Sequence, residues 1–322
     1  MRKLSLKSNL TSVLILCALI AIAPFFITKG YIMSIMVFVG IHAIVVLGLV
    51  LLQGYTGQIS LGHSAFFAIG AYVSAILATS LHLPPVLTII VGTVLSMLFS
   101  IVIGFATLRI KGDYLALATL AFGLLVYRLI VEFSELTGGY GGYRDIPKLP
   151  IGFLPFKKDV AYYSVVWLFV VIVFVFVNHI TKSPYGLFMR GVQKDEVAVS
   201  VLGINVFKLK MKVLLFSAAV TGFAGALYTH YVTFISPEVF LIDRSILFLM
   251  MVIVGGSQYS WGGIIGAVFL TFIPEYLKTY QDISIGMYGL VMMLVILYFP
   301  GGIASISTKL PGLIGKIRGT RK

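Results

Sequence analysis

The side chains best suited to acid–base or metal chemistry in this sequence are five histidines. None of them has the spacing of a metal site, and the HExxH pattern is absent. The neighbours His63 and Ser64 could supply the base and the nucleophile of a hydrolase, but no acidic residue can be identified that would orient the histidine. The sequence also lacks a GxxxxGKS/T loop, so the chain binds no ATP through a P-loop of its own. We therefore expect no catalytic residue, no metal and no cofactor in this chain. The five histidines are His42, His63, His82, His179 and His230.

A second group of polar residues interrupts the hydrophobic pattern where only two or three residues separate two apolar runs. The stretch GYTGQISLGHS, residues 54–64, is rich in glycine and carries no formal charge. Backbone that is not helical is tolerated at membrane depth only where protein or a water-filled cavity satisfies its polar groups. This stretch is therefore a candidate lining for the path of a zwitterion, although its small residues could equally serve close helix packing. The candidate lining residues are Gln58, Ser60, His63, Ser64 and, from a later run, Thr119.

The only long polar, cation-rich interval between hydrophobic runs extends over residues 181–212. Within it, residues 191–202 mix valines with charged side chains, which predicts a short helix lying on a membrane face. The acidic pair Asp195 and Glu196 falls in the early turns, where the helix dipole favours anions, and Gly203 supplies a C-terminal stop. Because no energy source is visible in the chain, we expect an external one to dock on this interval.

The amino-acid composition indicates the structural class of the protein. It has 322 residues, of which 59% are hydrophobic and 11% are charged, and its mean hydropathy is +1.05. These values predict an all-α polytopic membrane protein forming one transmembrane domain over residues 1–322, with no large soluble domain. The net charge of +13 comes from cations in loops and tails beside the hydrophobic runs, which indicates the positive-inside rule and contact with lipid rather than nucleic acid. Cys17 is the only cysteine, so disulfides are excluded.

The hydrophobic runs predict about ten membrane crossings. The first follows Arg2, Lys3 and Lys7 and could be a cleaved signal peptide, but we favour an uncleaved span. A faint echo relates the pentapeptides at 58–62 and 258–262, QISLG and QYSWG, and both lie where a hydrophobic run is interrupted. Paired interruptions of this kind point to a binding region in transporters. The predicted spans are residues 10–27, 31–52, 54–80, 84–109, 113–133, 162–177, 213–234, two shorter spans within 245–276 separated at 255–263, and 285–299.

The distribution of cations predicts the orientation. With the N-terminus inside and ten crossings, three cation clusters all fall on the cytoplasmic side. They are the interval 181–212, the pair Arg109 and Lys111, and the basic tail 303–322. Small residues predict where helices approach closely. The residues expected at such contacts are Gly62, Gly70, Gly222, Gly225, Gly262 and Gly266.

Three stretches carry a resemblance to a known family. They are LLQGYTGQISLGHSAFFAIGAY from residue 51, KGDYLALATLAFG from 111 followed by TGGYGG from 137, and residues 186–240, which begin GLFMRGVQKDEVAVSVLGINVFKLKMK. In this order they resemble the permease subunits of bacterial ABC importers for branched-chain amino acids, of the LivM type. One departure lies in the later interrupted segment. Where the family often has a GGxG pattern followed by a glycine-proline pair, this sequence has Gln258 and Gly263.

The resemblance implies a multi-pass protein of the bacterial inner membrane, with the broad architecture of the vitamin B12 (type II) permeases. It implies four kinds of partner: a LivH-like second permease, two cytoplasmic ATPases that bind ATP and Mg²⁺, and an extracytoplasmic binding protein. The interval 181–212 would contain the coupling helix. Permeases for urea, short amides or other amino acids share much of the pattern, and a passive channel is the alternative from another class. The residues matched to coupling are Arg190, Asp195, Glu196, Ala198, Gly203 and Asn205.

Overall fold

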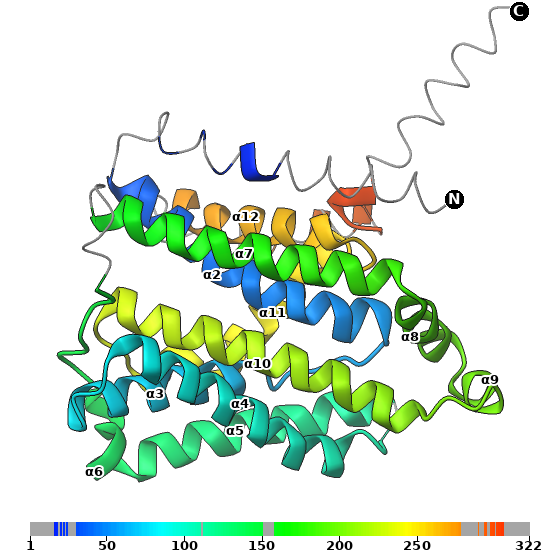
Figure 1. The fold of residues 1–322 in the computed structure, drawn as a ribbon, viewed down its shortest axis with the longest axis horizontal. Helices are drawn as coiled ribbons and strands as arrows, with labels where there is room; N and C mark the ends of the chain where they lie inside the picture. Colours follow the sequence, from blue (N-terminus) through cyan, green and yellow to red (C-terminus); the bar gives the residue numbers. More distant parts are fainter. Residues whose placement is uncertain are drawn as a thin grey trace, which may run out of the picture.

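The computed structural model describes residues 30–110, 112–150, 158–277 and 301–305, with single residues between 16 and 24 and between 289 and 299. Every named element in these ranges is a helix. One isolated antiparallel bridge, between Tyr143 and Ile235, joins two loops. Figure 1 shows the long helices running side by side, with the short helices α8 and α9 projecting at one end.

In the part of the chain that the structure describes, six helices are long and apolar enough to cross a membrane. The predicted spans between residues 31 and 234 are confirmed as helices, except that the span predicted over 54–80 is helical as α3 only from His63. Helix α7 extends beyond both predicted ends, and α10 begins seven residues earlier than predicted. The additional residues include charged side chains, such as Lys208 and Lys210, which the hydrophobic pattern alone did not include. These helices are α2 (Gly30–Leu49), which continues as the π-helix η1 (Val50–Tyr55), α3 (His63–Ser80), α4 (Pro85–Thr107), α5 (Asp113–Glu132), α7 (Lys158–Lys182) and α10 (Val206–Val232).

The region that predicted two shorter spans forms the helices α11 (Ile242–Gly255) and α12 (Ser260–Leu277). The break falls at Gly256, whose φ of +111° ends α11. At 1.5 Å per residue, α11 is only about 21 Å long, shorter than the roughly 30 Å of bilayer hydrocarbon. The predicted spans at 10–27 and 285–299 and the tail beyond residue 305 lie largely outside the described residues. The remaining short elements are α6 (Ser134–Thr137), η2 (Gly139–Gly141), α8 (Pro184–Lys194), α9 (Glu196–Val201), η3 (Pro237–Phe240) and η5 (Ile303–Ser305).

The long helices form a buried centre and an exposed side. The most apolar window of α2 is 89% buried within the protein, against 28% for that of α4. Helix α10 packs against α2, α3 and α4, while α2 also packs against α7 and α12. The outward side chains of α4, such as Val94 and Val102, are large and apolar. These side chains suit lipid, so α4 and α5 form a lipid-facing side and α2, α3 and α10 form the centre.

Helices α3, α4 and α10 approach one another through small residues. A Cβ added at Gly70 of α3 would lie 2.0 Å from the backbone oxygen of Gly222 in α10. A Cβ added at Gly222 would lie 2.3 Å from the Cβ of Ser96 in α4. In the same way, a Cβ at Gly225 would lie 2.0 Å from the oxygen of Phe67. The three backbones are therefore in contact with no room for a side chain.

Candidate functional site

The interrupted stretch forms a non-helical segment between η1 and α3. Its backbone is partly satisfied locally, since the amide of Gly57 donates to Gln53 O at 3.2 Å and that of Gln58 donates to Leu52 O at 3.0 Å. Gly57 has a φ of +68°, which favours glycine. A Cβ at Gly54 would lie 1.7 Å from the oxygen of Ser257. Protein therefore surrounds the segment closely, as non-helical backbone at membrane depth requires.

The polar side chains of this segment bond to one another and to neighbouring helices. His63 Nδ1 lies 3.0 Å from Ser60 Oγ, and His63 Nε2 lies 2.9 Å from Ser217 Oγ in the middle of α10. The five predicted lining residues are all buried. Because their polar groups are mostly paired within the protein, in this conformation they join helices.

Ser64 and Thr119 make two further links of the same kind. The hydroxyl of Ser245, in α11, donates to Ser64 Oγ at 2.9 Å and accepts from the Ser64 amide at 2.8 Å. The amide of Leu61 donates to Thr119 Oγ1 at 3.0 Å. Gln58 is only partly paired. Its side-chain nitrogen Nε2 donates to Thr56 Oγ1 at 2.7 Å, and its side-chain oxygen is buried without a partner in the described structure. Ser217 and Ser245 were not predicted as site residues, since a serine inside a span carries no signal of its own.

A second polar cluster joins α2, α11 and α12 and was also not predicted as a site. His42 Nδ1 lies 2.9 Å from Thr271 Oγ1 in α12. Arg244 Nη1 lies 3.3 Å from His42 Nε2, and Arg244 Nε donates to the oxygen of Val239 at 3.2 Å. The available signal for this cluster was an arginine beside a hydrophobic run. The predicted spans leave Arg244 in a loop, because the next span was predicted to begin at residue 245.

The predicted single helix over residues 191–202 is wrong. Helix α8 ends at Lys194, Asp195 is extended with φ −154° and ψ 107°, and α9 begins at Glu196. The side chain of Asp195 accepts from the amides of Val197 at 2.9 Å and Ala198 at 3.2 Å. An aspartate that caps the following amides competes with continuation of the preceding helix, and the chain breaks there. Gly203 follows α9 with a φ of +80°, as a C-terminal stop requires.

Two contacts within the interval 181–212 fix its path to α10, and a third connects it to η1. Glu196 forms an ion pair with the buried Lys210 of α10. Asn205 caps α10 by accepting from the amide of Lys208 at 2.9 Å. The guanidinium of Arg190 lies over the Tyr55 ring, 4.9 Å from its centroid. Tyr55 in turn donates from its hydroxyl to Gln258 O at 3.0 Å. Arg190 therefore connects α8 to both interrupted segments.

The outer side of α9 is apolar and exposed. Val197, Val201 and Leu202 are 65%, 80% and 73% exposed. A Cβ at Gly203 would meet nothing within 4 Å. We name the surface of Val197, Val201, Leu202 and Gly203 the α9 surface. The short helix α9 lies at one end of the bundle (Figure 1), so these apolar side chains are left uncovered by the rest of the described protein.

A family model described as "Branched-chain amino acid transport system / permease component" matches residues 31–300. The chain belongs to this family. Among relatives, LivM of Salmonella typhimurium is 31% identical over 92% of this chain and 76% of its own length. LivM of Escherichia coli is 30% identical over the same shares of the two chains. A LivH permease of Methanocaldococcus jannaschii is 25% identical over 82% of this chain and 88% of its own length. No solved structure matches significantly.

The chain is accordingly a membrane permease subunit of an ABC importer and belongs in the bacterial inner membrane as a multi-pass protein. The names of its relatives include two kinds of permease, LivM and LivH. Transporter membrane subunits of this family are not enzymes.

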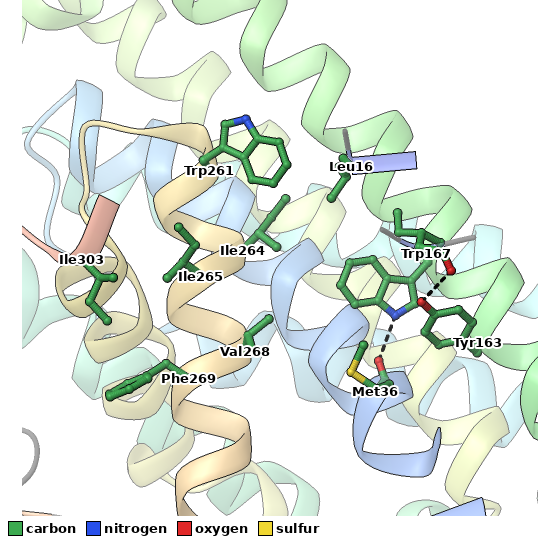
Figure 2. Close-up of a pocket in the computed structure, with 11 residues that line it drawn as sticks. Leu16, Met36, Tyr163, Trp167, Trp261, Ile264, Ile265, Val268, Phe269 and Ile303 are labelled. Carbon is green, nitrogen blue, oxygen red and sulfur yellow. Dashed lines mark hydrogen bonds between the residues drawn. The ribbon is translucent and has the colours of Figure 1, made fainter. Parts of the chain in front are cut away.

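One apolar cavity in the described part of this permease does not suit a zwitterion. Its volume is ≈ 410 Å³, and it lies between α2, α7 and α12 (Figure 2). The Trp167 indole donates to Met36 O at 3.0 Å, and the Tyr163 hydroxyl donates to Ile20 O at 3.1 Å. With these donors engaged, the cavity presents only hydrocarbon. Its lining is Leu16, Ile20, Met36, Tyr163, Trp167, Trp261, Ile264, Ile265, Val268, Phe269 and Ile303.

Replacing His63 with phenylalanine is expected to destabilise the permease. The ring would still fill the buried space, but the hydroxyls of Ser60 and Ser217 would lose their partner. Each buried polar group left unpaired costs about 1–3 kcal/mol. The thermal midpoint of the purified protein in detergent measures the loss. His179→Phe, at an exposed position of α7, is the matched control and should shift the midpoint little. Equal shifts in the two variants would contradict the role given to His63.

Proposed function

We propose that this chain is one of two permease subunits of an ATP-driven importer that moves leucine, isoleucine and valine into the cell. A LivH-like permease, two cytoplasmic ATPases binding ATP and Mg²⁺, and an extracytoplasmic binding protein complete the machine. The observation that carries the proposal is the α9 surface, which is apolar, exposed and firmly attached to the bundle. A separate ATPase is the partner for which such a surface is suited, because the chain has no P-loop of its own.

The coupling role rests on how the interval 181–212 is fixed. Asp195 caps α9, Glu196 pairs with Lys210 at the start of α10, and Asn205 caps α10 itself. A force on α9 therefore reaches α10 directly. A second route leads from α8 through Arg190 to Tyr55, at the end of η1. Together with Ala198 and Gly203, these are the residues we propose for coupling.

The proposed orientation places the α9 surface in the cytoplasm with both chain termini. Several segments meet at this end of the bundle, since a Cβ at Gly57 would lie 3.1 Å from Gln193 and a Cβ at Gly302 would lie 2.3 Å from Gly256. The chain thus returns to the same side after α2, α7 and α11. The positive-inside rule then favours the cytoplasm for this side, because Lys208, Lys210 and Lys212 lie beside it.

The proposed architecture has about ten helices and resembles the vitamin B12 permeases. Six spans, the half-length α11 and α12 account for the part of the chain that is described in detail. The predicted spans at 10–27 and 285–299 would complete the count. For the substrate path we propose the region where the interrupted segment faces α5, α10 and α11. Its wall would include Gln58, Ser60, His63, Ser64 and Thr119, which must then move with the interval 181–212.

The transport experiment uses vesicles that contain both permeases, with and without the two ATPases and the binding protein. Uptake of radiolabelled leucine is expected only with ATP and the complete set, and excess isoleucine or valine should compete with it. Urea, acetamide and nucleosides serve as the competing substrates. Inhibition by one of these alone would assign another substrate. Leucine flux through the permeases without the ATPases would favour a passive channel and overturn the proposal.

A further inference from the structure

Arg244 places a cation near the middle of the membrane. Its Nη1 lies 3.3 Å from Nε2 of His42, and His42 lies within the span Gly30–Tyr55. At 1.5 Å per residue, His42 is about 18 Å along the helix from Gly30 and about 20 Å from Tyr55. The chain reaches this depth because residues 233–241 turn back into the protein after α10, where Phe240 of η3 is buried. Helix α11 therefore begins close to the midplane.

Arg244 forms no ion pair with an acidic side chain among the residues that the structure describes, and its chain neighbour Asp243 is exposed. His42 supplies no charge either: its Nε2 faces the arginine donor and must accept, so the ring is neutral and its Nδ1 donates to Thr271 Oγ1. A cation at the centre of a span costs about 2.5–3.5 kcal/mol on insertion scales, and such residues normally serve a function.

The hydrogen bonds of Arg244 leave part of the guanidinium available. Nε donates to Val239 O and Nη1 donates to His42 Nε2. A guanidinium has five N–H groups, so these two contacts position it, and with respect to the described residues the other N–H groups remain for a ligand. The guanidinium presents its N–H groups in one plane. This geometry matches a carboxylate, which the guanidinium binds through two parallel hydrogen bonds.

The surface beside Arg244 is not a lipid surface. Asp243 is exposed and Ile246 is 38% exposed on the same turn of α11. A carboxylate at this depth faces water or another protein chain rather than hydrocarbon. Arg244 itself is only partly buried. The first turn of α11 therefore borders either an aqueous path or the second permease.

We propose that Arg244 binds the carboxylate of the amino acid as it crosses the membrane. The inference rests on the proposed function and adds the chemical class that this permease selects, a free α-carboxylate. One cationic contact, held in place by His42 and Val239, assists entry of an anionic group without enclosing it. The exposed Asp243 offers the opposite charge beside it, as a zwitterion requires.

The test uses cysteine labelling in the complete transporter in vesicles. Cys17→Ser removes the native thiol, and Leu247→Cys places a new one a helical turn from Arg244. The rates of reaction with a negatively and a positively charged methanethiosulfonate are compared. In the Arg244→Gln variant, the ratio of anion to cation rate is expected to fall at least about fivefold, because one nearby charge has been removed. Leucine should slow labelling, and leucinamide, which lacks the carboxylate, should not.

Uptake provides the second measurement. Arg244→Gln is expected to lower leucine uptake more than tenfold and Arg244→Lys to lower it less, with the thermal midpoint of each complex measured alongside. Arg128→Gln, at an exposed position of α5, is the matched control and should retain uptake. An unlabelled Leu247→Cys, an unchanged rate ratio or wild-type uptake by Arg244→Gln would overturn this inference alone. Failure of the unmodified transporter to take up leucine would overturn the proposed function with it.

Discussion

Replacing Val201 and Leu202 together with glutamate is expected to abolish ATP-driven uptake while the permease still folds and inserts. Both side chains are largely exposed, so the substitutions remove no internal packing. In the complex they would press two carboxylates into an apolar contact. Each buried charge without a partner costs several kcal/mol, which predicts a loss of uptake well beyond tenfold. Uptake of radiolabelled leucine into vesicles measures it, and co-purification of the ATPases shows whether docking has failed.

The matched control exchanges the same two residues within the apolar class, Val201→Leu with Leu202→Val. It keeps the hydrocarbon of the α9 surface and should transport near the wild-type rate. Two other substitutions are less clean. Glu196→Arg breaks the ion pair with Lys210, and Gly203→Glu forces a side chain into a φ of +80°. Both should uncouple ATP hydrolysis from uptake, but they would also change the conformation of the interval 181–212. Wild-type uptake by the double glutamate variant would remove α9 from the coupling role.

The spans could be predicted because a hydrophobic run of sufficient length has few alternatives in a membrane. Their ends could not, as α10 shows. It begins at Val206, and Lys208, Lys210 and Lys212 lie in its first turns. The three lysines predict a basic loop at this position, yet Lys210 is buried against Glu196. Only the tertiary contact supplies the counter-charge that admits a lysine into the helix.

The residues of the candidate sites were likewise predictable only where their structural signals are local in the sequence. The turn at Gly203 and the caps at Asp195 and Asn205 depend on neighbours within three residues, and such signals are present in the sequence. The break at Asp195 was nevertheless missed, because residues 191–202 also suit one continuous helix. Contacts such as His63 with Ser217 join residues far apart in the chain. No local pattern encodes them, and without the fold they are single polar residues in hydrophobic runs.

Substituting Gly70 with alanine is expected to prevent α3 and α10 from packing. The new Cβ would lie 2.0 Å from the oxygen of Gly222, a backbone atom that no rotamer change can move. Helices α3 and α10 would have to separate, which would also disturb α4, since a Cβ at Gly92 would lie 2.7 Å from Gly70 O. Overpacking of a close contact costs about 1–3 kcal/mol, and more where the backbone is the obstacle.

The thermal midpoint in detergent and the yield of the assembled permease pair test this expectation. Gly30→Ala is the matched control, because Gly30 also lies in a helix but a Cβ there meets nothing within 4 Å. Alanine has a higher helix propensity than glycine by roughly 1 kcal/mol, so this control should be neutral or slightly stabilising. Both substitutions add the same methyl group, and the interior position of Gly70 gains at least as much helix propensity as the first residue of α2, so a loss of stability in Gly70→Ala alone reports the contact of α3 with α10. A Gly70→Ala permease as stable as Gly30→Ala would mean that the two backbones are not in contact at this point, and the three-helix centre would need another basis.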